Sequence, residues 1–352
     1  MRIRKLLAVI LVAFAFTSLL YANGAMEAYA AESTKSETFV YTDSLGREIT
    51  LPRDITRVAP SGNVAQLAIY AVAPEKMVGW SSKISGDAMK TFLPDVAKLP
   101  VFGAFYGKKA NLNKEALIAA DPQVVIDVGE IKGSAESMAK QLDELSAEIG
   151  IPVVFVEGYL KNTGDMFRSI GKILGKEADA ETLAAYSEKA LELAAKNHDS
   201  INKSIYYSSS QDGLAAIETG SFHGELIEVV GAENVVPATF SGSNGTTSLE
   251  NLLLWNPDVI LLSNKDAYDN ALSDKAWGEL DAVKNGSIYL IPSSPYSFID
   301  SPPATNRIIG IYWLGSVLAP DAYNVDIEKE VRDYYSLFYH KSLSDEELRT
   351  IL

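Results

Sequence analysis

The chain has 352 residues with 31 basic and 46 acidic side chains, and its formal net charge is −15 at pH 7. A surface this acidic repels phosphate backbones, so we expect no nucleic-acid partner. The chain contains no cysteine, which excludes disulfides, thiolate metal sites and cysteine nucleophiles. Its length indicates two domains rather than one.

The first thirty residues have the pattern of a secretory signal peptide. Three basic residues fall within the first five, an apolar run covers residues 6–20, and residues 28–30 read Ala-Tyr-Ala. This order of charged, apolar and small residues is typical of export signals. The run is shorter than the roughly 20 residues of a membrane-spanning helix. We therefore predict a signal peptide over residues 1–30, with an uncleaved membrane anchor as the alternative.

The chain after this segment is expected to be exported and soluble. Residues 31–37 are polar and should form a flexible N-terminus. No later segment is apolar enough to cross a membrane. The protein would then lie in the periplasm or at the cell surface, without an anchor attached through cysteine.

Residues 38–160 have the pattern of an α/β lobe. Residues 43–46 supply turn chemistry between two short strands. Short apolar runs, typical of strands covered by helices on both faces, lie at 57–60, 124–127 and 153–156. A helix is predicted between the last two, because Met138, Leu142, Leu145 and Ile149 fall on one helical face.

Residues 161–199 predict helices that connect two lobes. Residues 181–197 are rich in Ala, Leu, Glu and Lys and contain no glycine or proline. The α/β alternation resumes over 200–352, with strands expected at 205–207, 259–262 and 288–291 and helices at 223–230, 305–318 and 327–339. We therefore predict an α/β fold in which two Rossmann-like lobes with parallel-type sheets are joined by a long connecting helix.

One pattern occurs in both predicted lobes. Glu115 and Glu250 each open a short helix, and each precedes a proline, Pro122 or Pro257, by the same spacing. A buried strand follows in both cases. Glutamate is generally favoured in a first helical turn and proline between a helix and a strand, so chance is the simple alternative. The matched spacing indicates equivalent positions on two similar lobes.

The order of these features over residues 38–340 resembles the periplasmic binding proteins for iron-siderophores, cobalamin and haem, the ABC-importer receptors with a long helical hinge. The resemblance rests on the Asp-x-x-Gly-Arg run at 43–47, Leu51-Pro52, Arg57-Val58, the two helix–Pro–strand units, the central helix, and residues 221–227 and 231–235. It implies a ligand bound between the lobes, no cofactor, and delivery to a permease. It also implies that Glu115 and Glu250 dock onto arginines of that permease.

A further stretch resembles one subgroup of these receptors. Residues 298–307, followed by Gly310 and by Trp-Leu-Gly at 313–315, are similar to proteins associated with molybdate, tungstate or haem-type ligands. This similarity points away from cobalamin. The ligand implied is an iron complex, such as a siderophore or a haem-like compound, or a related oxyanion.

Candidate ligand residues follow predicted strands, because ligands of open α/β sheets bind beyond the carboxyl ends of strands and near helix N-termini. From the first lobe these are Ser61, Asn63, Trp80, Ser81, Tyr106 and Tyr159; from the second they are His223, Tyr296 and Arg307. Helix capping is the alternative for Ser61, a surface salt bridge for Arg307, and packing at a helix entry for His223. His223 is also a candidate to ligate a metal centre or to donate to an oxyanion.

An exported α/β enzyme is the competing class of function. The sequence has no nucleophile elbow, phosphate loop or metal-hydrolase motif. Three scattered histidines cannot form a closed zinc site, so a direct metal site is not expected. A structural or adhesion protein is disfavoured by the α/β alternation. We therefore expect a monomeric receptor, not an enzyme, whose partners are a small-molecule ligand and a permease.

Overall fold

The structure is a computed structural model that describes residues 37–84, 86–105, 110–240 and 245–352. The predicted signal peptide, residues 31–36 and the candidate Tyr106 lie outside these ranges. Within the described ranges, no helix combines the length and apolar character needed to cross a membrane.

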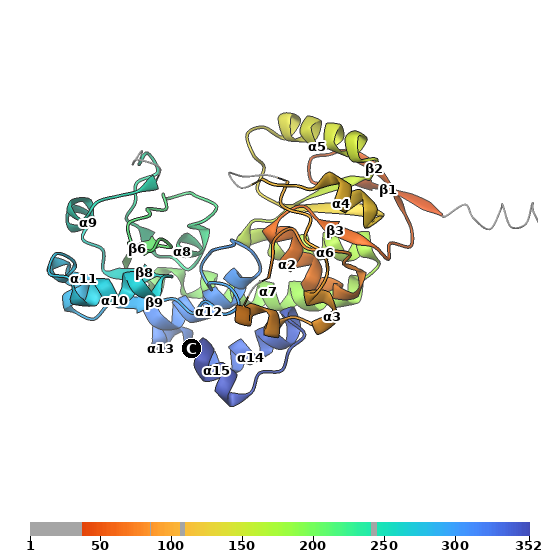
Figure 1. Ribbon diagram of the computed structural model, residues 1–352. Helices are drawn as coiled ribbons and strands as arrows, with labels where there is room; N and C mark the ends of the chain where they lie inside the picture. The colour runs from red at the N-terminus through yellow and green to blue at the C-terminus, as the bar shows by residue number, and fades with distance from the viewer. Residues whose placement is uncertain (1–36, 85, 106–109, 241–244) are drawn as a thin grey trace, which may run out of the picture.

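The first lobe is built on a small parallel sheet (Figure 1). An antiparallel hairpin of β1 (Thr38–Thr42) and β2 (Glu48–Pro52) precedes it. The sheet has the order β3-β4-β5, with β3 at Val58–Pro60, β4 at Val124–Gly129 and β5 at Val153–Glu157. The helices of this lobe are α2 (Asn63–Val72), α3 (Pro94–Ala97), α4 (Lys114–Ala119) and α5 (Ala135–Ile149), with 3-10 helices η1 (Pro74–Lys76) and η2 (Gly86–Thr91).

Helix α5 illustrates how local sequence sets these elements. Ser134 accepts a hydrogen bond from the Ser137 amide and so caps the N-terminus. Gly150 ends the helix with a φ of 69°, a left-handed conformation that glycine adopts without steric cost. Met138 and Leu142 are buried against the sheet. The predicted helix and its apolar face are therefore confirmed.

Two helices connect the lobes. Helix α6 (Thr163–Leu174) ends at Gly175, and α7 (Glu177–Asn197) follows directly. The two pack closely because Gly171 has no side chain: a Cβ there would lie 2.4 Å from the Cβ of Ala180. The 3-10 helices η3 (Leu160–Asn162) and η4 (His198–Ser200) flank the pair. The predicted connector thus consists of two helices packed side by side rather than one continuous helix.

The second lobe contains a four-stranded parallel sheet with the order β7-β6-β8-β9. Its strands are β6 (Ser204–Ser208), β7 (Glu233–Asn234), β8 (Val259–Leu262) and β9 (Ile288–Leu290). Its helices are α8 (Glu225–Val229), α9 (Leu249–Trp255), α10 (Lys265–Ser273), η6 (Trp277–Glu279) and α11 (Asp281–Lys284). The prediction of two parallel α/β lobes joined by helices is confirmed.

In the view of Figure 1 the C-terminal helices lie below the two lobes, around their junction. They are α12 (Asn306–Leu318), α13 (Pro320–Tyr323), α14 (Ile327–Phe338) and α15 (Asp345–Ile351). Helix α12 packs along α7, and α14 packs against α2 and α12. The Tyr70 hydroxyl of α2 donates to the Tyr339 carbonyl at 3.2 Å. The end of the chain is therefore tied to the first lobe as well as to the connector.

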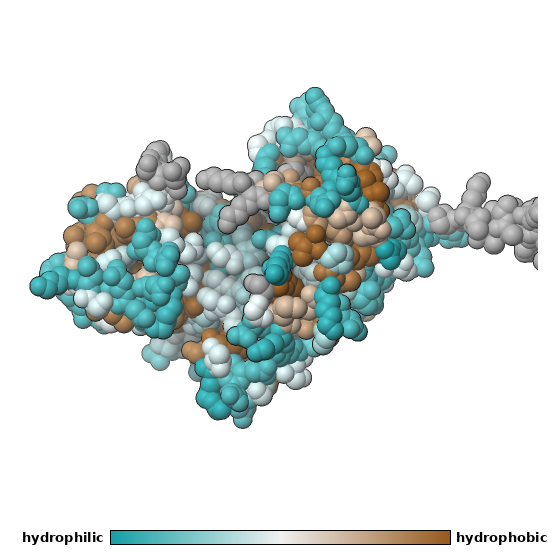
Figure 2. Space-filling view, in the orientation of Figure 1, coloured by the Kyte–Doolittle hydropathy of each residue, from teal (hydrophilic) through white to brown (hydrophobic). Residues whose placement is uncertain are grey.

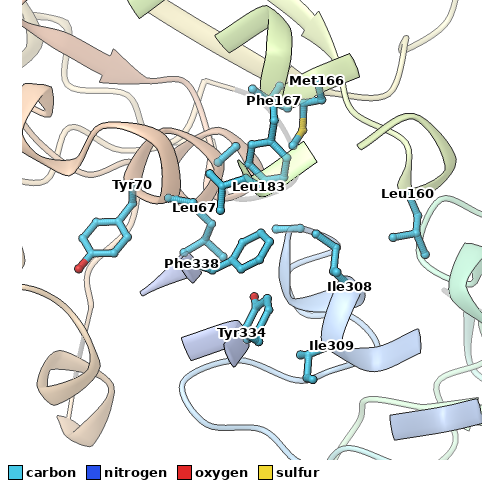
Figure 3. Packing of buried hydrophobic residues seen from close by; sticks show 14 of the residues in the cluster. Leu67, Tyr70, Leu160, Met166, Phe167, Leu183, Ile308, Ile309, Tyr334 and Phe338 are labelled. Carbon is cyan, nitrogen blue, oxygen red and sulfur yellow. The ribbon is translucent and has the colours of Figure 1, made fainter. Parts of the chain in front are cut away.

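A shared apolar core joins the connector to α2, α12 and α14. Figure 3 shows Phe338 of α14 in one cluster with Phe167 of α6, Leu183 of α7 and Ile308 of α12. The rings of Phe167 and Phe338 lie 5.8 Å apart in an edge-to-face arrangement, and Tyr334 stacks on Phe338 at 4.5 Å. Side chains from four helices fill this space, so its packing holds the helices at a set distance.

Phe338→Ala should lower the free energy of unfolding by about 3–5 kcal/mol, because it leaves a cavity in this core. Phe338 is 1% exposed. Urea unfolding followed by circular dichroism would measure the change. Ser336→Ala, at an exposed position of the same helix, should change the value by less than about 0.5 kcal/mol. Equal small effects of both substitutions would contradict the assigned core.

Candidate ligand-binding cleft

Residues from both lobes line one cavity, which we call the interlobe cleft. Its volume is about 350 Å³. The first lobe contributes Ser61, Gly62, Asn63, Val64, Ala104, Asp127, Val128 and Lys132; the second contributes His223, Ser301, Pro302 and Pro303. In Figure 2 the surface between the lobes is pale and teal rather than brown on the face shown. The cleft itself combines polar and charged side chains with apolar ones such as Val64 and Val128.

Three of the candidate residues meet in this cleft. Ser61 follows β3, Asn63 begins α2, and His223 reaches the same cavity from the second lobe. They converge because strands of a parallel sheet end at one edge, where the next helix begins. The N-cap residue of α2 is Gly62, so the helix has no side-chain cap. Its first-turn amides and the positive end of its dipole thus border the cleft, an arrangement that favours anions.

Ser61 binds a carboxyl group instead of capping α2. Its hydroxyl donates to Oδ1 of Asp127, and both side chains are buried, with Asp127 only 5% exposed. Oδ2 of Asp127 has no partner among the described residues. Burial raises the pKa of Asp127, while Ser61 and the charges of Lys132 and Arg47 act in the opposite direction. Asp127 is therefore a carboxyl group whose neutral form is favoured relative to free aspartate.

On the opposite wall, His223 is held by an acidic partner. Its Nδ1 lies 2.9 Å and 3.0 Å from the two carboxyl oxygens of Asp300, which is 3% exposed. The hydrogen bond with Asp300 raises the pKa of His223. The imidazolium form is thus favoured at a position that faces the cleft. Ser301 beside it has a φ of 63°, a left-handed conformation that is uncommon for a residue with a side chain.

Arg307 lies behind the cleft wall in a buried ion pair. It is 2% exposed, and its Nη1 donates to Oε2 of Glu225 and to the carbonyl of Phe222, both at 3.0 Å. Glu225 also accepts hydrogen bonds from the amides of Leu160 (2.9 Å), at the end of the first lobe, and Lys161 (3.3 Å), at the start of the connector. The pair therefore links α12, the loop that carries His223, and the start of the connector. It is not a surface salt bridge.

The structure places the other candidates outside the lining of the cleft. Trp80 is 1% exposed, and its Nε1 donates to the Val96 carbonyl in the core of the first lobe. Ser81 is buried and donates to Gln66 at 2.8 Å. Tyr296 is half-buried and packs edge-on against Phe92.

Tyr159 lines a neighbouring cavity of about 410 Å³ together with Phe222, Glu225 and Glu228. The rings of Tyr159 and Phe222 lie 5.5 Å apart, so an aromatic contact joins the two lobes here. Another cavity of about 410 Å³ lies between α2, α7 and α14. That cavity is remote from the ends of the strands, and we assign no ligand to it.

The two glutamates of the repeated pattern occupy equivalent positions. Glu115 and Glu250 are both exposed in the first turn of α4 and α9, and each helix has a side-chain cap, Asn113 or Ser248. Each helix precedes a central strand of its own sheet, β4 or β8. The lobes thus present the same acidic helix start to solvent, as the repeat predicted.

Four charged side chains that line the cleft or hold its residues were not predicted from the sequence: Asp127, Lys132, Glu225 and Asp300. A charged residue at the end of the apolar run Val124–Ile126 was the available indication of Asp127. Nothing local distinguishes Glu225 from other glutamates at a helix start. Across the described ranges, no three His, Asp or Glu side chains converge as a metal site, and the partner of His223 is the carboxyl group of Asp300.

Breaking the buried ion pair between Glu225 and Arg307 should destabilise the protein. Glu225→Leu is expected to lower the free energy of unfolding by about 3 kcal/mol or more, because it leaves the Arg307 guanidinium buried without its counter-ion. The double variant Glu225→Leu/Arg307→Met should lose less than the sum of the two single variants. Urea unfolding of the four proteins measures this coupling. Strict additivity would contradict a direct ion pair.

Comparison with known proteins shows which family has this architecture. Residues 58–295 match the periplasmic binding protein family. The chain is 27% identical over 335 residues to the molybdate-binding protein MolA of Haemophilus influenzae, covering 86% of this chain and 91% of that protein. An ABC transporter solute-binding protein structure from Sulfurospirillum deleyianum matches with a TM-score of 0.80 at 30% identity, covering 89% of this chain and 98% of the other.

The structure of MolA bound to molybdate matches with a TM-score of 0.70 at 24% identity and covers 87% of this chain and 99% of that one, a likeness in fold. These findings confirm the resemblance seen in the sequence. Since the family match spans well over half of the chain, the protein belongs to the periplasmic binding protein family and is a solute-binding protein of an ABC importer.

Proposed function

We propose that this receptor captures a compact oxyanion of the molybdate or tungstate type in the interlobe cleft and delivers it to its permease. The observation that carries the proposal is the convergence of positive groups from both lobes. The N-terminus of α2 and Lys132 border the cleft on one side, and the imidazole of His223 borders it on the other. The name of the relative MolA, a molybdate-binding protein, points to the same class of ligand.

The size of the cleft also favours a small ligand. A cavity of about 350 Å³ lies at the lower end of the range for small-molecule sites. A tetrahedral oxyanion fits within it, whereas a siderophore complex, haem or cobalamin needs more room. An iron complex remains the second candidate, because the neighbouring cavity offers the aromatic rings of Tyr159 and Phe222 for stacking.

The mechanism we infer is capture between lobes followed by handover. An anion that contacts α2 and His223 bridges the two lobes and favours the closed arrangement. The connector helices and the core around them limit that motion to a small rotation. We take the chain to act as an exported monomer that performs no catalysis.

His223→Ala should weaken the binding of molybdate about tenfold or more, because it removes a charged hydrogen-bond donor from the cleft. Affinity should also fall as the pH rises through the raised pKa of His223, since the imidazolium is lost in that range. Isothermal titration calorimetry with molybdate, tungstate, sulfate, a ferric siderophore and haem measures both effects. His198→Ala, at the exposed end of α7, is the matched control.

Tight binding of an iron chelate with no binding of oxyanions would reject the oxyanion ligand in favour of the iron complex. Turnover of a substrate without saturable binding of any of these ligands would reject the receptor itself.

Reversing both exposed glutamates tests delivery separately from capture. Glu115→Arg/Glu250→Arg should abolish transport while the ligand affinity stays unchanged, because both side chains are exposed on helices that do not line the cleft. Uptake into proteoliposomes that contain the permease measures the first effect, and calorimetry measures the second. Glu136→Arg/Asp266→Arg reverses one exposed first-turn acid in each lobe as a control. Normal uptake by the double variant at 115 and 250 would exclude these two residues as docking sites.

A further inference from the structure

Asp127 is an unexpected neighbour for an anion. It lines the interlobe cleft, it is 5% exposed, and its Oδ1 already accepts the Ser61 hydroxyl. Its Oδ2 is buried and has no partner among the described residues. A buried polar atom without a partner is rare in a native structure and calls for an explanation, and at the wall of a cleft a bound ligand is one that can be tested.

An ionised Asp127 would repel a bound anion at short range in a site of low dielectric. A single proton between Oδ2 and a ligand oxygen removes that repulsion and forms a hydrogen bond. The carboxylic acid can donate to the anion, or the carboxylate can accept from a protonated anion. Both descriptions contain the same atoms and the same net charge, so they predict the same linkage to pH.

The charges around Asp127 are compatible with a shared proton. Ser61 faces it from the end of β3, Lys132 follows it beyond β4, and Arg47 lies in the turn between β1 and β2. Across the cleft stand His223 and its partner Asp300. Burial outweighs the opposing influence of Ser61, Lys132 and Arg47, so the pKa of Asp127 is raised.

We propose that the receptor binds its oxyanion together with one proton, held between Oδ2 of Asp127 and an oxygen of the ligand. This inference rests on the proposed oxyanion function and adds a basis for selectivity. Molybdate, tungstate and phosphate are conjugate bases of weaker acids than the one that yields sulfate, so they hold the shared proton more readily. Asp127 therefore discriminates against sulfate, which has the same shape and charge as molybdate.

The proton has a defined source and destination. Where Asp127 of the free protein is ionised, binding takes one proton from the solvent. Where Asp127 is already protonated, that proton stays in the site and the net uptake falls to zero. Above the pKa of Asp127 in the free protein, the Kd should therefore rise about tenfold for each pH unit through this group alone.

The experiment measures molybdate and sulfate affinity by calorimetry between pH 6 and pH 9, and proton uptake from the dependence of the heat on buffer ionisation enthalpy. Asp127→Asn keeps the shape and supplies a neutral amide that donates without a titrating proton. For molybdate, the slope of log Kd against pH should be smaller by about one unit in this variant than in the wild type. At the alkaline end it should bind more tightly than the wild type, and its preference for molybdate over sulfate should be smaller.

Asp95→Asn is the matched control, since Asp95 is exposed in the first turn of α3 and does not line the cleft; it should behave like the wild type. His223→Gln separates the contribution of the histidine, because the dependence of Kd on pH that Asp127 causes should persist in this variant. If Asp127→Asn fails to fold, the proton uptake of the wild-type protein and of His223→Gln still decides the question.

If the wild type binds an oxyanion but Asp127→Asn shows the same dependence of Kd on pH, the shared proton is overturned and the proposed function stands. The same conclusion follows if His223→Gln takes up no proton on binding at pH 9. Absence of oxyanion binding by the wild type at every pH would overturn the proposed function and this inference with it.

Discussion

The packing of the connector helices against α2, α12 and α14 determines how the two lobes lie relative to each other. Helices α6 and α7 contact one another through the small residues Gly171 and Ala180, and helices from both ends of the chain cover them. Close-packed cores do not deform continuously, so the width of the cleft is set by side-chain volumes rather than by a flexible linker. The buried bonds of Glu225 to Arg307 and to the Leu160 amide extend this rigid joint to the edge of the cleft.

A rigid joint has a consequence for recognition. The N-terminus of α2 in one lobe and His223 in the other already face one cavity. A ligand that needs both does not have to order them, which lowers the entropic cost of binding. Asp300 contributes in the same way, because it orients the His223 ring and favours its charged form. In the proposed anion site, the acidic side chain of Asp300 would thus favour binding through His223.

Position along the sequence predicted where the cleft lies better than it predicted which side chains line the cleft. Ser61, Asn63 and His223 line the cleft as expected from their places after strands and at helix starts. Trp80 forms an isolated bridge with Val101 instead of following a strand, and its ring is buried on Tyr70 and Phe92. Consecutive side chains after a strand point to different sides of the backbone, so proximity to a strand end does not fix the direction of a side chain. Arg307 was predicted to contact the ligand or to form a surface salt bridge, but its guanidinium turns to Glu225 inside the protein.

The amino-acid sequence by itself determined the elements and their class. Apolar runs marked the parallel strands, periodic apolar positions marked α5 and the connector, and the Glu-to-Pro spacing marked two equivalent lobes. These properties depend on residues close together in the chain, where propensity and periodicity act.

Only the tertiary structure decided which side chains meet. Asp127 and His223 are far apart in the sequence, and Glu225 finds its partners in a different lobe and in α12. Contacts of this kind arise from the register of the sheets and from the packing of the connector. Their energy depends on burial, which no local pattern of residues specifies.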